Sequence, residues 1–333
     1  MATIGTALTL ADWAKRTDPD GRIAKVAELL AQQNEIINHA AFQQGNLPTG
    51  HRYTVRTGLP SVYWRLLNKG VAPSKSTTAQ ATDSCGILEA RGQVDVDIAS
   101  LENDLAAFRL SEATPFLEAM TQEFVSTLFY GVASDPEEFI GLSARYSDST
   151  AANGQNIIKA GGAGSDNASI WLVVWGPETV FGIFPKGSSA GIVHEDLGVG
   201  DAFDANNNRF RAYLDRWQIK GAVSVKDWRF AVRIPNIDVS NLVAESSAAN
   251  ITKLMTKAWH RIPSWGMGRA AWYMNRTCAE MLDIQRMNVV AGNGTVAGTT
   301  ATFENVDGVN RLSFRGIPIY VTDALTEAES LVA

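Results

Sequence analysis

Cysteine is scarce in this 333-residue chain, which contains only Cys85 and Cys278. Two widely separated cysteines lack the close spacing of a zinc site and are too few for a disulfide framework, so we expect two reduced thiols in a cytosolic protein. The four histidines are also scattered: His39, His51, His194 and His260. The sequence therefore predicts no metal site.

Long hydrophobic runs are missing too. No apolar segment approaches the length of about 20 residues that crosses a bilayer, so we expect no membrane partner. The first residues, MATIGTALTLADWAKR, have neither a basic start nor a cleavage pattern, and we expect no signal peptide.

The chain has no excess of positive charge. Its net charge is −6, and 45 % of its residues are hydrophobic against 19 % charged, as in an ordinary globular protein. The chain as a whole therefore has no electrostatic reason to bind DNA. Charge is nevertheless uneven, because residues 52–91 hold six basic and two acidic residues, whereas residues 99–150 hold nine acidic and two basic ones. Such runs are usually solvated faces, but they also suit contact between two copies of the chain.

Catalytic motifs are weak. Gly187-Ser188-Ser189-Ala190-Gly191 matches the G-x-S-x-G nucleophile pattern, in which Ser189 would attack a carbonyl. That pattern requires a helix directly after the serine, whereas the following Gly-Ile-Val-His does not begin one, and only His260 stands in the usual order for a base. A tight loop between strands explains the motif better, so we expect no catalytic residue.

Other polar clusters give no better site. The glycines at 161–164 lack both dinucleotide spacing and a P-loop lysine, which predicts a flexible loop and no cofactor. His194-Glu195-Asp196 is more typical of a solvated turn than of metal ligands. The carboxylates at 135, 137 and 138 surround a proline in a turn, where paired-carboxylate catalysis has little support.

Periodicity predicts an α+β chain with few helices. Residues 1–50 are interpreted as an arm with one helix through Ile23, Val26, Leu30 and Ile37. The strongest helix is expected over 114–130, with Thr114 as N-cap, Pro115 at the first helical position and Gly131 as the stop. Two further helices are expected over 250–262 and 275–286, capped by Asn250 and Asn275.

Alternation predicts strands between these helices. Residues 62–67 and 94–98 alternate, and a polar, structureless connection over 68–84 separates them, so residues 51–98 are interpreted as a two-stranded arm with a mobile tip. The apolar run IWLVVW at 170–175 is typical of a strand buried on both faces, and 179–184 is expected to pair back on it. Strands are also expected at 209–217, 228–234 and 317–322, with Arg229 and Arg233 on the face opposite Phe230.

Three stretches together resemble a known family. Residues 169–198 (SIWLVVWGPETVFGIFPKGSSAGIVHEDLG) are similar to a segment of major capsid proteins from short-tailed phages related to epsilon-fifteen. Residues 270–282 (AAWYMNRTCAEML) and 314–325 (FRGIPIYVTDAL) resemble patterns of tailed-phage major capsid proteins. Each motif alone is weak, but their order is fairly specific and the match covers most of the chain. The resemblance is to the Hong Kong 97-type capsid fold.

That resemblance implies a domain plan and a function. Residues 1–50 would be an N-terminal arm, 51–98 an extended loop, 99–152 a peripheral domain with a spine helix and strands from later in the chain, and 153–333 mainly an axial domain whose end returns to the peripheral one. Copies would form hexamers and pentamers of an icosahedral virion capsid around double-stranded DNA, without sequence-specific binding and after assembly in the bacterial host cytoplasm. Scaffolding, portal and decoration proteins are candidate partners.

The predicted contacts between copies follow from charge and the resemblance. They lie in the extended loop and near the spine helix: Trp64, Arg65, Lys69, Lys75, Glu112, Glu118 and Glu123. Some relatives crosslink loop lysines to a neighbour's asparagine, but no acceptor or catalytic acid is identified here. Two alternatives are an encapsulin-type cargo shell of the same fold and, from another class, a serine hydrolase using Ser189.

Overall fold

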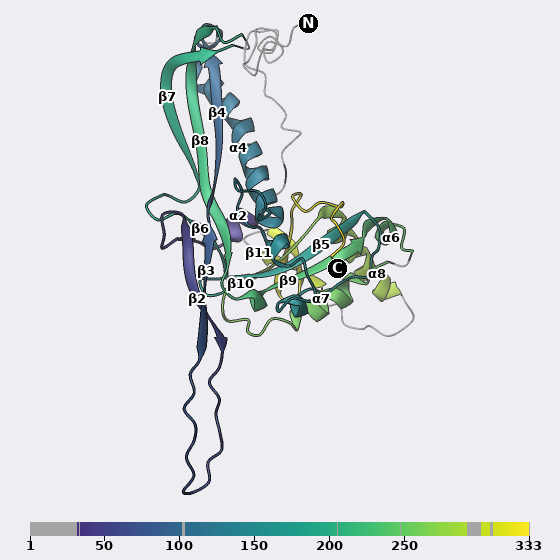
Figure 1. Ribbon diagram of the computed structural model, residues 1–333. Helices are drawn as coiled ribbons and strands as arrows, with labels where there is room; N and C mark the ends of the chain where they lie inside the picture. Colours follow the sequence, from purple (N-terminus) through teal and green to yellow (C-terminus); the bar gives the residue numbers. More distant parts are fainter. Residues whose placement is uncertain are drawn as a thin grey trace.

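The computed structural model has the predicted α+β fold and describes residues 32, 34–101, 104–204, 206–246, 248–291, 301–306 and 309–332. Figure 1 shows a globular body, an upright part formed by α4 (Leu105–Tyr130) and three strands, and a thin hairpin that points the opposite way. The helix predicted through Ile23, Val26 and Leu30 lies outside the described residues. Within the described part of the arm, Ile36 begins a short helix.

The elements follow a mixed order along the chain. The strands are β1 (Phe42–Gln44), β2 (Gly50–Gly58), β3 (Thr77–Ser84), β4 (Gly86–Asp95), β5 (Asn167–Trp175), β6 (Val180–Phe184), β7 (Ile192–Phe203), β8 (Arg209–Val225), β9 (Ala231–Asp238), β10 (Arg269–Met274), β11 (Ala301–Val306), β12 (Val309–Phe314) and β13 (Ile317–Val321). The helices besides α4 are α2 (Ile36–His39), α3 (Val96–Ala99), α5 (Leu142–Arg145), α6 (Val239–Val243), α7 (Ile251–Trp259) and α8 (Arg276–Ala291), with 3₁₀ turns at 154–156 and 228–230.

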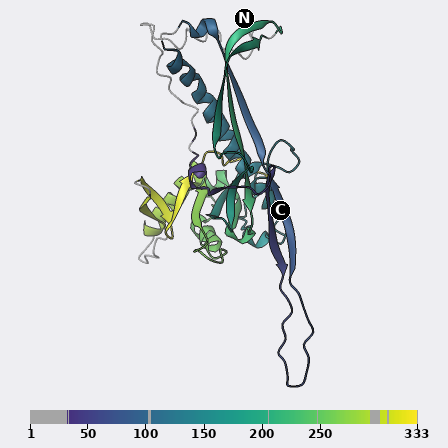
Figure 2. The same ribbon diagram turned by 90° about the vertical axis from the view of Figure 1, so that its left-hand side faces the viewer.

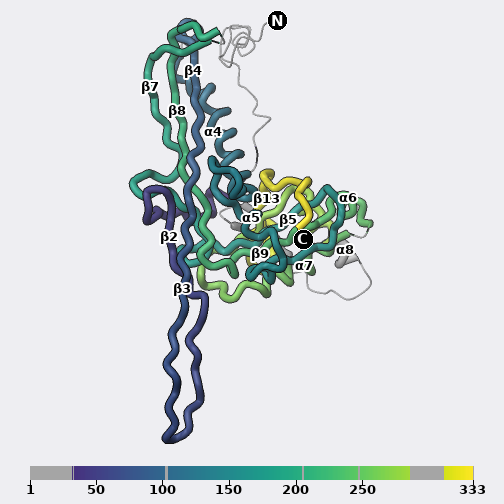
Figure 3. The backbone as a smooth tube through the Cα atoms, viewed as in Figure 1, coloured from purple at the N-terminus to yellow at the C-terminus, as the bar shows by residue number. Residues whose placement is uncertain are grey.

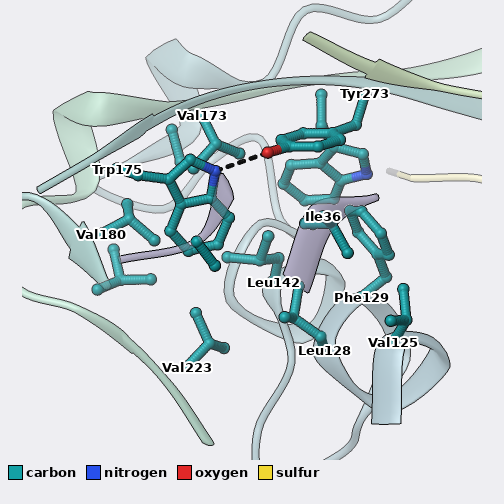
Figure 4. Close-up of a cluster of buried hydrophobic side chains, with 14 of the residues drawn as sticks. Ile36, Val125, Leu128, Phe129, Leu142, Val173, Trp175, Val180, Val223 and Tyr273 are labelled. Atoms are coloured by element: carbon teal, nitrogen blue, oxygen red, sulfur yellow. Dashed lines mark hydrogen bonds between the residues drawn. The ribbon is translucent and has the colours of Figure 1, made fainter. Parts of the chain in front are cut away.

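The body is built on both faces of β5. All nine residues of this strand are buried, which confirms the strand predicted from its apolar run. Trp171, Val173 and Trp175 point into one core with the end of α4, whereas the alternate residues enter a second core with α7 and α8. Figure 4 shows the first core, in which Trp175 Nε1 donates a hydrogen bond of 2.8 Å to the Tyr273 hydroxyl. The β sheet is therefore the middle of three layers.

Strand β8 joins the body to the upright part. Its last residues pair with β6 in the body, and its earlier residues pair with β4 on one side and β7 on the other. Gly221 stands at the change of partner, where an added Cβ would lie 3.1 Å from the Phe124 ring and 3.3 Å from the Ile183 carbonyl. Figures 1 and 2 both show α4 running beside β4 and β8. One strand therefore belongs to two sheets.

Helix α4 begins earlier than predicted. It runs from Leu105 and is capped by Asp104, whose carboxylate accepts from the Ala107 amide at 3.0 Å. Thr114 is therefore not its N-cap, and Pro115 lies in the helix interior. The Thr114 hydroxyl instead donates to the Leu110 carbonyl. The predicted stop is confirmed, since the Gly131 amide bonds the Thr127 carbonyl.

The strands predicted around the arm are partly wrong. Residues 59–76 form no strand, because the chain between β2 and β3 has no pairing partner in its own sheet. Conversely, β3 covers 77–84, which had been expected to be structureless. The alternation at 94–98 ends in α3, and β4 pairs along its whole length with β8 rather than with the hairpin.

Two predictions within the body are corrected. Residues 180–184 do not fold back on β5; β6 pairs with β1 and β8 and meets β5 only at Trp175. Residues 228–230 form a 3₁₀ turn, and β9 begins at Ala231. The caps of α7 and α8 are confirmed, because the side chains of Asn250 and Asn275 accept from the amides three residues later.

Arg233 is buried rather than exposed. Its guanidinium donates to Glu329 Oε2 at 2.8 Å and to the Tyr146 carbonyl at 3.0 Å. Glu329 also accepts from the Tyr130 hydroxyl at 2.6 Å and from the Ser169 hydroxyl. Burial, followed by the nearby Glu329 charge, raises the pKa of Tyr130. This paired cluster fixes the end of the chain against β5, β9 and the end of α4.

Candidate intersubunit surfaces

The hairpin tip, residues 59–76, is unusually apolar for an exposed segment. Val62 and Leu67 are 88 % and 90 % exposed, and Trp64 is fully exposed. Leu59, Tyr63, Leu66 and Val71 are exposed too. The tube in Figure 3 shows this tip far from the body. A contiguous apolar surface of this kind on a soluble protein marks a place where another molecule binds.

The base of the hairpin is fixed to the body by polar contacts. Asp83, which is 7 % exposed, accepts from Arg145 Nη2 at 2.9 Å and from the Ser224 hydroxyl at 2.6 Å. On the other strand the Tyr53 hydroxyl donates to the Val225 carbonyl at 2.9 Å. Burial raises the pKa of Tyr53, and burial also raises the pKa of the neighbouring Cys85 thiol to about 11. The base of the hairpin is therefore anchored to the body.

The predicted contact residues occupy two separate places. Trp64, Arg65, Lys69 and Lys75 are exposed on the hairpin tip, and Glu112, Glu118 and Glu123 lie along α4. Within one chain they are not brought together, since the tip and α4 extend in opposite directions (Figures 1 and 2). A contact between the two groups therefore requires two copies of the chain.

The acidic residues of α4 differ in their surroundings. Glu118 Oε1 accepts from Gln122 Nε2 at 2.8 Å and from the Gln32 amide at 2.9 Å. Glu123 is exposed. Together with Glu137 and Glu138 it lines a cavity beside the first residues of β4. Three carboxylates at one cavity provide a suitable partner for a basic segment.

Sequence reasoning missed a charged cluster between α4, β7 and β8. Arg109 Nη2 lies 2.8 Å from Asp215 Oδ1 and 3.0 Å from Asp196 Oδ1, and His194 Nε2 lies 2.8 Å from the same Asp215 oxygen. The hydrogen bond to Asp196 is the main reason for the raised pKa of Arg109, and the same bond lowers the pKa of Asp196. The cluster holds α4 against β7 and β8. It could not be predicted from sequence, because its residues come from segments that are far apart in the chain.

The apolar tip was also misjudged as strand. The available signal was that Leu59, Val62, Leu66 and Leu67 occur in a stretch bounded by a proline, an asparagine and glycines, where a paired strand is a poor fit. The exposure of these side chains is visible only in the folded structure.

The structure does not build a hydrolase site at Ser189. This serine is exposed in a loop between β6 and β7, and the chain continues into a strand rather than the helix that the nucleophile motif requires. His260 caps the end of α7 and lies 3.4 Å from Arg315. In the part of the chain that the structure describes, no group of three or more His, Cys, Asp or Glu side chains is arranged to hold a metal ion. Among the same residues, no helix is long and apolar enough to cross a membrane.

Comparisons with known proteins agree with this geometry. The profile of the family "Major capsid protein GP7" matches residues 18–333. The capsid structure of bacteriophage Epsilon15 is 32 % identical, with a TM-score of 0.74 and full coverage of both chains. No curated protein matches significantly.

Two other solved structures are less similar to this chain. The capsid of bacteriophage JBD30 (8 % identity, TM-score 0.49) covers 89 % of this chain and 92 % of its own. The SrpI encapsulin of Synechococcus elongatus (11 % identity, TM-score 0.44) covers 69 % of this chain and 96 % of its own. Scores below 0.5 add nothing to the assignment, which rests on the family profile and the full-length match. The chain therefore belongs to the GP7 family of major capsid proteins, the structural subunits of phage heads.

Proposed function

We propose that this chain assembles into hexamers and pentamers of an icosahedral head, and that each copy's hairpin tip lies across the α4 region of a neighbour. The observation that carries the proposal is the exposed apolar tip, which no other part of the described chain covers. A two-stranded hairpin is marginally stable by itself in water. A neighbouring subunit would both stabilise the hairpin and cover its apolar residues.

Charge supports the choice of α4 as the receiving surface. The tip carries Arg65, Lys69 and Lys75, and the receiving region carries Glu112, Glu118 and Glu123. Complementary charge sets register and partner choice more than it sets affinity. A head-to-tail contact of this kind repeats around a ring, which closes into a capsomer.

The remaining parts take their roles from this assembly. Residues 1–50 serve as an arm, 51–98 include the extended loop, 99–152 with β7 and β8 form the peripheral domain with α4 as its spine, and 153–333 are mainly the axial domain. The shell encloses double-stranded DNA without reading its sequence and assembles in the host cytoplasm. Scaffolding, portal and decoration proteins are its further partners, and the chain has no catalytic activity. Since the family is that of phage major capsid proteins, an encapsulin-type cargo shell is not favoured.

The test removes the apolar tip without touching the body. In the triple variant Val62→Ala, Trp64→Ala, Leu67→Ala, the concentration needed for particle formation should rise by about 30-fold or more, the effect of losing about 2 kcal/mol at an interface hot spot. The melting temperature of the unassembled chain should be unchanged, because these three side chains are almost fully exposed in the described part of the chain.

The matched control is Val243→Ala, which trims an exposed apolar side chain on α6. Its assembly should be normal. Normal assembly of the triple variant would contradict the proposal. The predicted contact between the basic tip and the carboxylates of a neighbouring copy is tested by a structure of the assembled particle. A distance greater than the Debye length of about 10 Å from Lys69 and Lys75 to every carboxylate of the neighbours would refute that contact.

A further inference from the structure

Helix α7 and the turn that follows it carry a row of cations that the predicted contacts leave unused. Lys253, Lys257 and Arg261 follow one another at four-residue spacing and are all exposed. Leu254 and Met255 on the opposite face are buried in the second core. Within the described residues, no ion pair engages any of the three cations. Lys253 and Lys257 lie about one helical turn apart on α7, and Arg261 lies in the turn that follows the helix.

The row ends at an open cavity lined by aromatic rings and guanidinium groups. Trp259 and Trp265 stack with their ring centroids 5.0 Å apart, and Arg315 Cζ lies 4.9 Å from the centroid of the Trp259 ring. Arg269 lines the same cavity. Both tryptophans are partly buried against the second core, and aromatic rings beside cations are typical of surfaces that bind nucleic acid.

Arg315 occupies a backbone position that does not suit it. It is the first residue of the two-residue turn between β12 and β13, where Arg315 has a φ of 54° and Gly316 a φ of 76°. Turns with two positive φ angles favour Asn-Gly or Gly-Gly. Residues held in a strained backbone conformation cluster at functional sites, so this arginine is a candidate functional residue. Here the side chain is held against Trp259 and points its charge to the cavity.

This face is a second basic part of an acidic protein, besides residues 52–91. Residues 250–279 contain five basic residues and no acidic one, although the whole chain carries −6. Of these five, Arg276 pairs with Asp323 and is neutralised locally. The whole-chain charge therefore conceals a cationic surface formed by the α7 row together with Arg269 and Arg315.

We propose that the α7 row and the adjoining cavity bind the phosphate backbone of DNA, so that this face of the body is turned toward the packaged genome. The inference rests on the proposed function, in which the shell encloses double-stranded DNA. The three cations can contact about three phosphates of one strand, which repeat every 3.4 Å along the helix axis. Contact with phosphates alone needs no sequence preference.

The first experiment measures binding of the full-length, unassembled chain to a labelled 20-base-pair duplex over a range of salt concentrations. In the variant Lys253→Gln, Lys257→Gln, Arg261→Gln, the slope of log affinity against log salt should fall by about 3, since each phosphate contact contributes about 0.9. The matched control removes three exposed cations elsewhere, with Arg56→Gln, Lys159→Gln and Lys186→Gln. It should leave the slope unchanged. Equal slopes in both variants would overturn the inference.

Arg315→Asn separates charge from folding. Asparagine fits the positive φ of this turn better than arginine, so the variant should keep its melting temperature or gain slightly. Its salt slope should nevertheless fall by about 1, as for the loss of one phosphate contact. An unchanged slope contradicts a role for the cavity. Competition by polyglutamate of equal charge as strong as that by DNA would assign the surface to an acidic protein and overturn the nucleic-acid proposal.

The second experiment uses the particle itself. Lysines are acetylated in DNA-filled and emptied particles and quantified by mass spectrometry, with Lys159 and Lys186 as internal references. Lys253 and Lys257 should be labelled several-fold less in filled particles only. Equal labelling in intact particles overturns this inference and leaves the proposed function standing, whereas failure of the chain to form particles contradicts the proposed function instead.

Discussion

Strand β5 and the hairpin tip are both rich in large apolar residues, yet their surroundings are opposite. Every residue of β5 is buried between two cores, whereas most of the apolar residues between Leu59 and Val71 face solvent. Burying a large apolar side chain stabilises a fold by about 1.5–3 kcal/mol. The body obtains this stabilisation from its own chain, and the tip can obtain it only from another molecule. Folding and assembly therefore draw on different parts of one sequence.

The largest effect on stability is expected from a substitution in the globular body. Glu329→Gln leaves the buried Arg233 guanidinium without its charge partner, so the unassembled chain should lose about 3–5 kcal/mol of unfolding free energy, measured by chemical denaturation. Glu178→Gln is the control, since its ion pair with Lys226 is largely exposed and should be worth less than about 1 kcal/mol. Equal losses in the two variants would show that burial does not distinguish the pairs.

An intermediate effect is expected where the two regions meet. Asp83→Asn weakens the bonds to Arg145 and Ser224 and should cost about 1–3 kcal/mol in the attachment of the hairpin. Hydrogen exchange at β2 and β3 should accelerate, while exchange in β5 stays unchanged. Thr82→Val, which removes an exposed acceptor for Arg52 on the same strand, is the control and should change little. Acceleration in β5 as well would mean that hairpin and body unfold as one unit.

The smallest effect concerns pH at the same base. Burial lowers the pKa of His51, despite the opposing charge of Asp83, and Lys226 lowers it further. Because the unfolded chain then binds the proton more readily, stability contributed here is present above the ordinary histidine pKa of about 6.5 and is lost as pH falls below it. After correction for the pH dependence of the intrinsic exchange rate, protection of the β2 amides should therefore fall modestly from pH 7.5 to 5.5. His51→Phe keeps a ring against Phe181 and should remove that dependence; a dependence that survives belongs to another group.

Local signals predicted local structure well. Asn250 and Asn275 could be identified as caps because each capping hydrogen bond joins residues only three positions apart. The strand at 170–175 could be identified because a short run of consecutive apolar residues indicates a strand buried on both faces. Pro115 was misleading, since a proline that fits the start of a helix also occurs inside α4. The true cap, Asp104, is followed by Leu105 and Phe108 at helical spacing, a signal that the prediction of a start at Thr114 overlooked.

What could not be predicted depends on partners far away in the chain. Alternation placed Arg233 on the strand face opposite Phe230, but its burial depends on distant partners such as Glu329, which comes 96 residues later. Residues 62–67 alternate as a strand does, but alternation forms a strand only where a second strand is available. The family resemblance supplied the fold that periodicity alone did not. The contacts between copies remain predictions.

Strand β8 has a mechanical consequence for a shell built from this subunit. Its 17 residues, about 56 Å long at 3.3 Å per residue, form one continuous ladder shared by the body and the upright part. No loop between the two regions lies on this strand to act as a hinge. If the head changes diameter, we therefore expect the subunit to bend gradually along β8 near Gly221. At this residue the pairing partner of β8 changes from β4 to β6, and glycine has no side chain to resist bending.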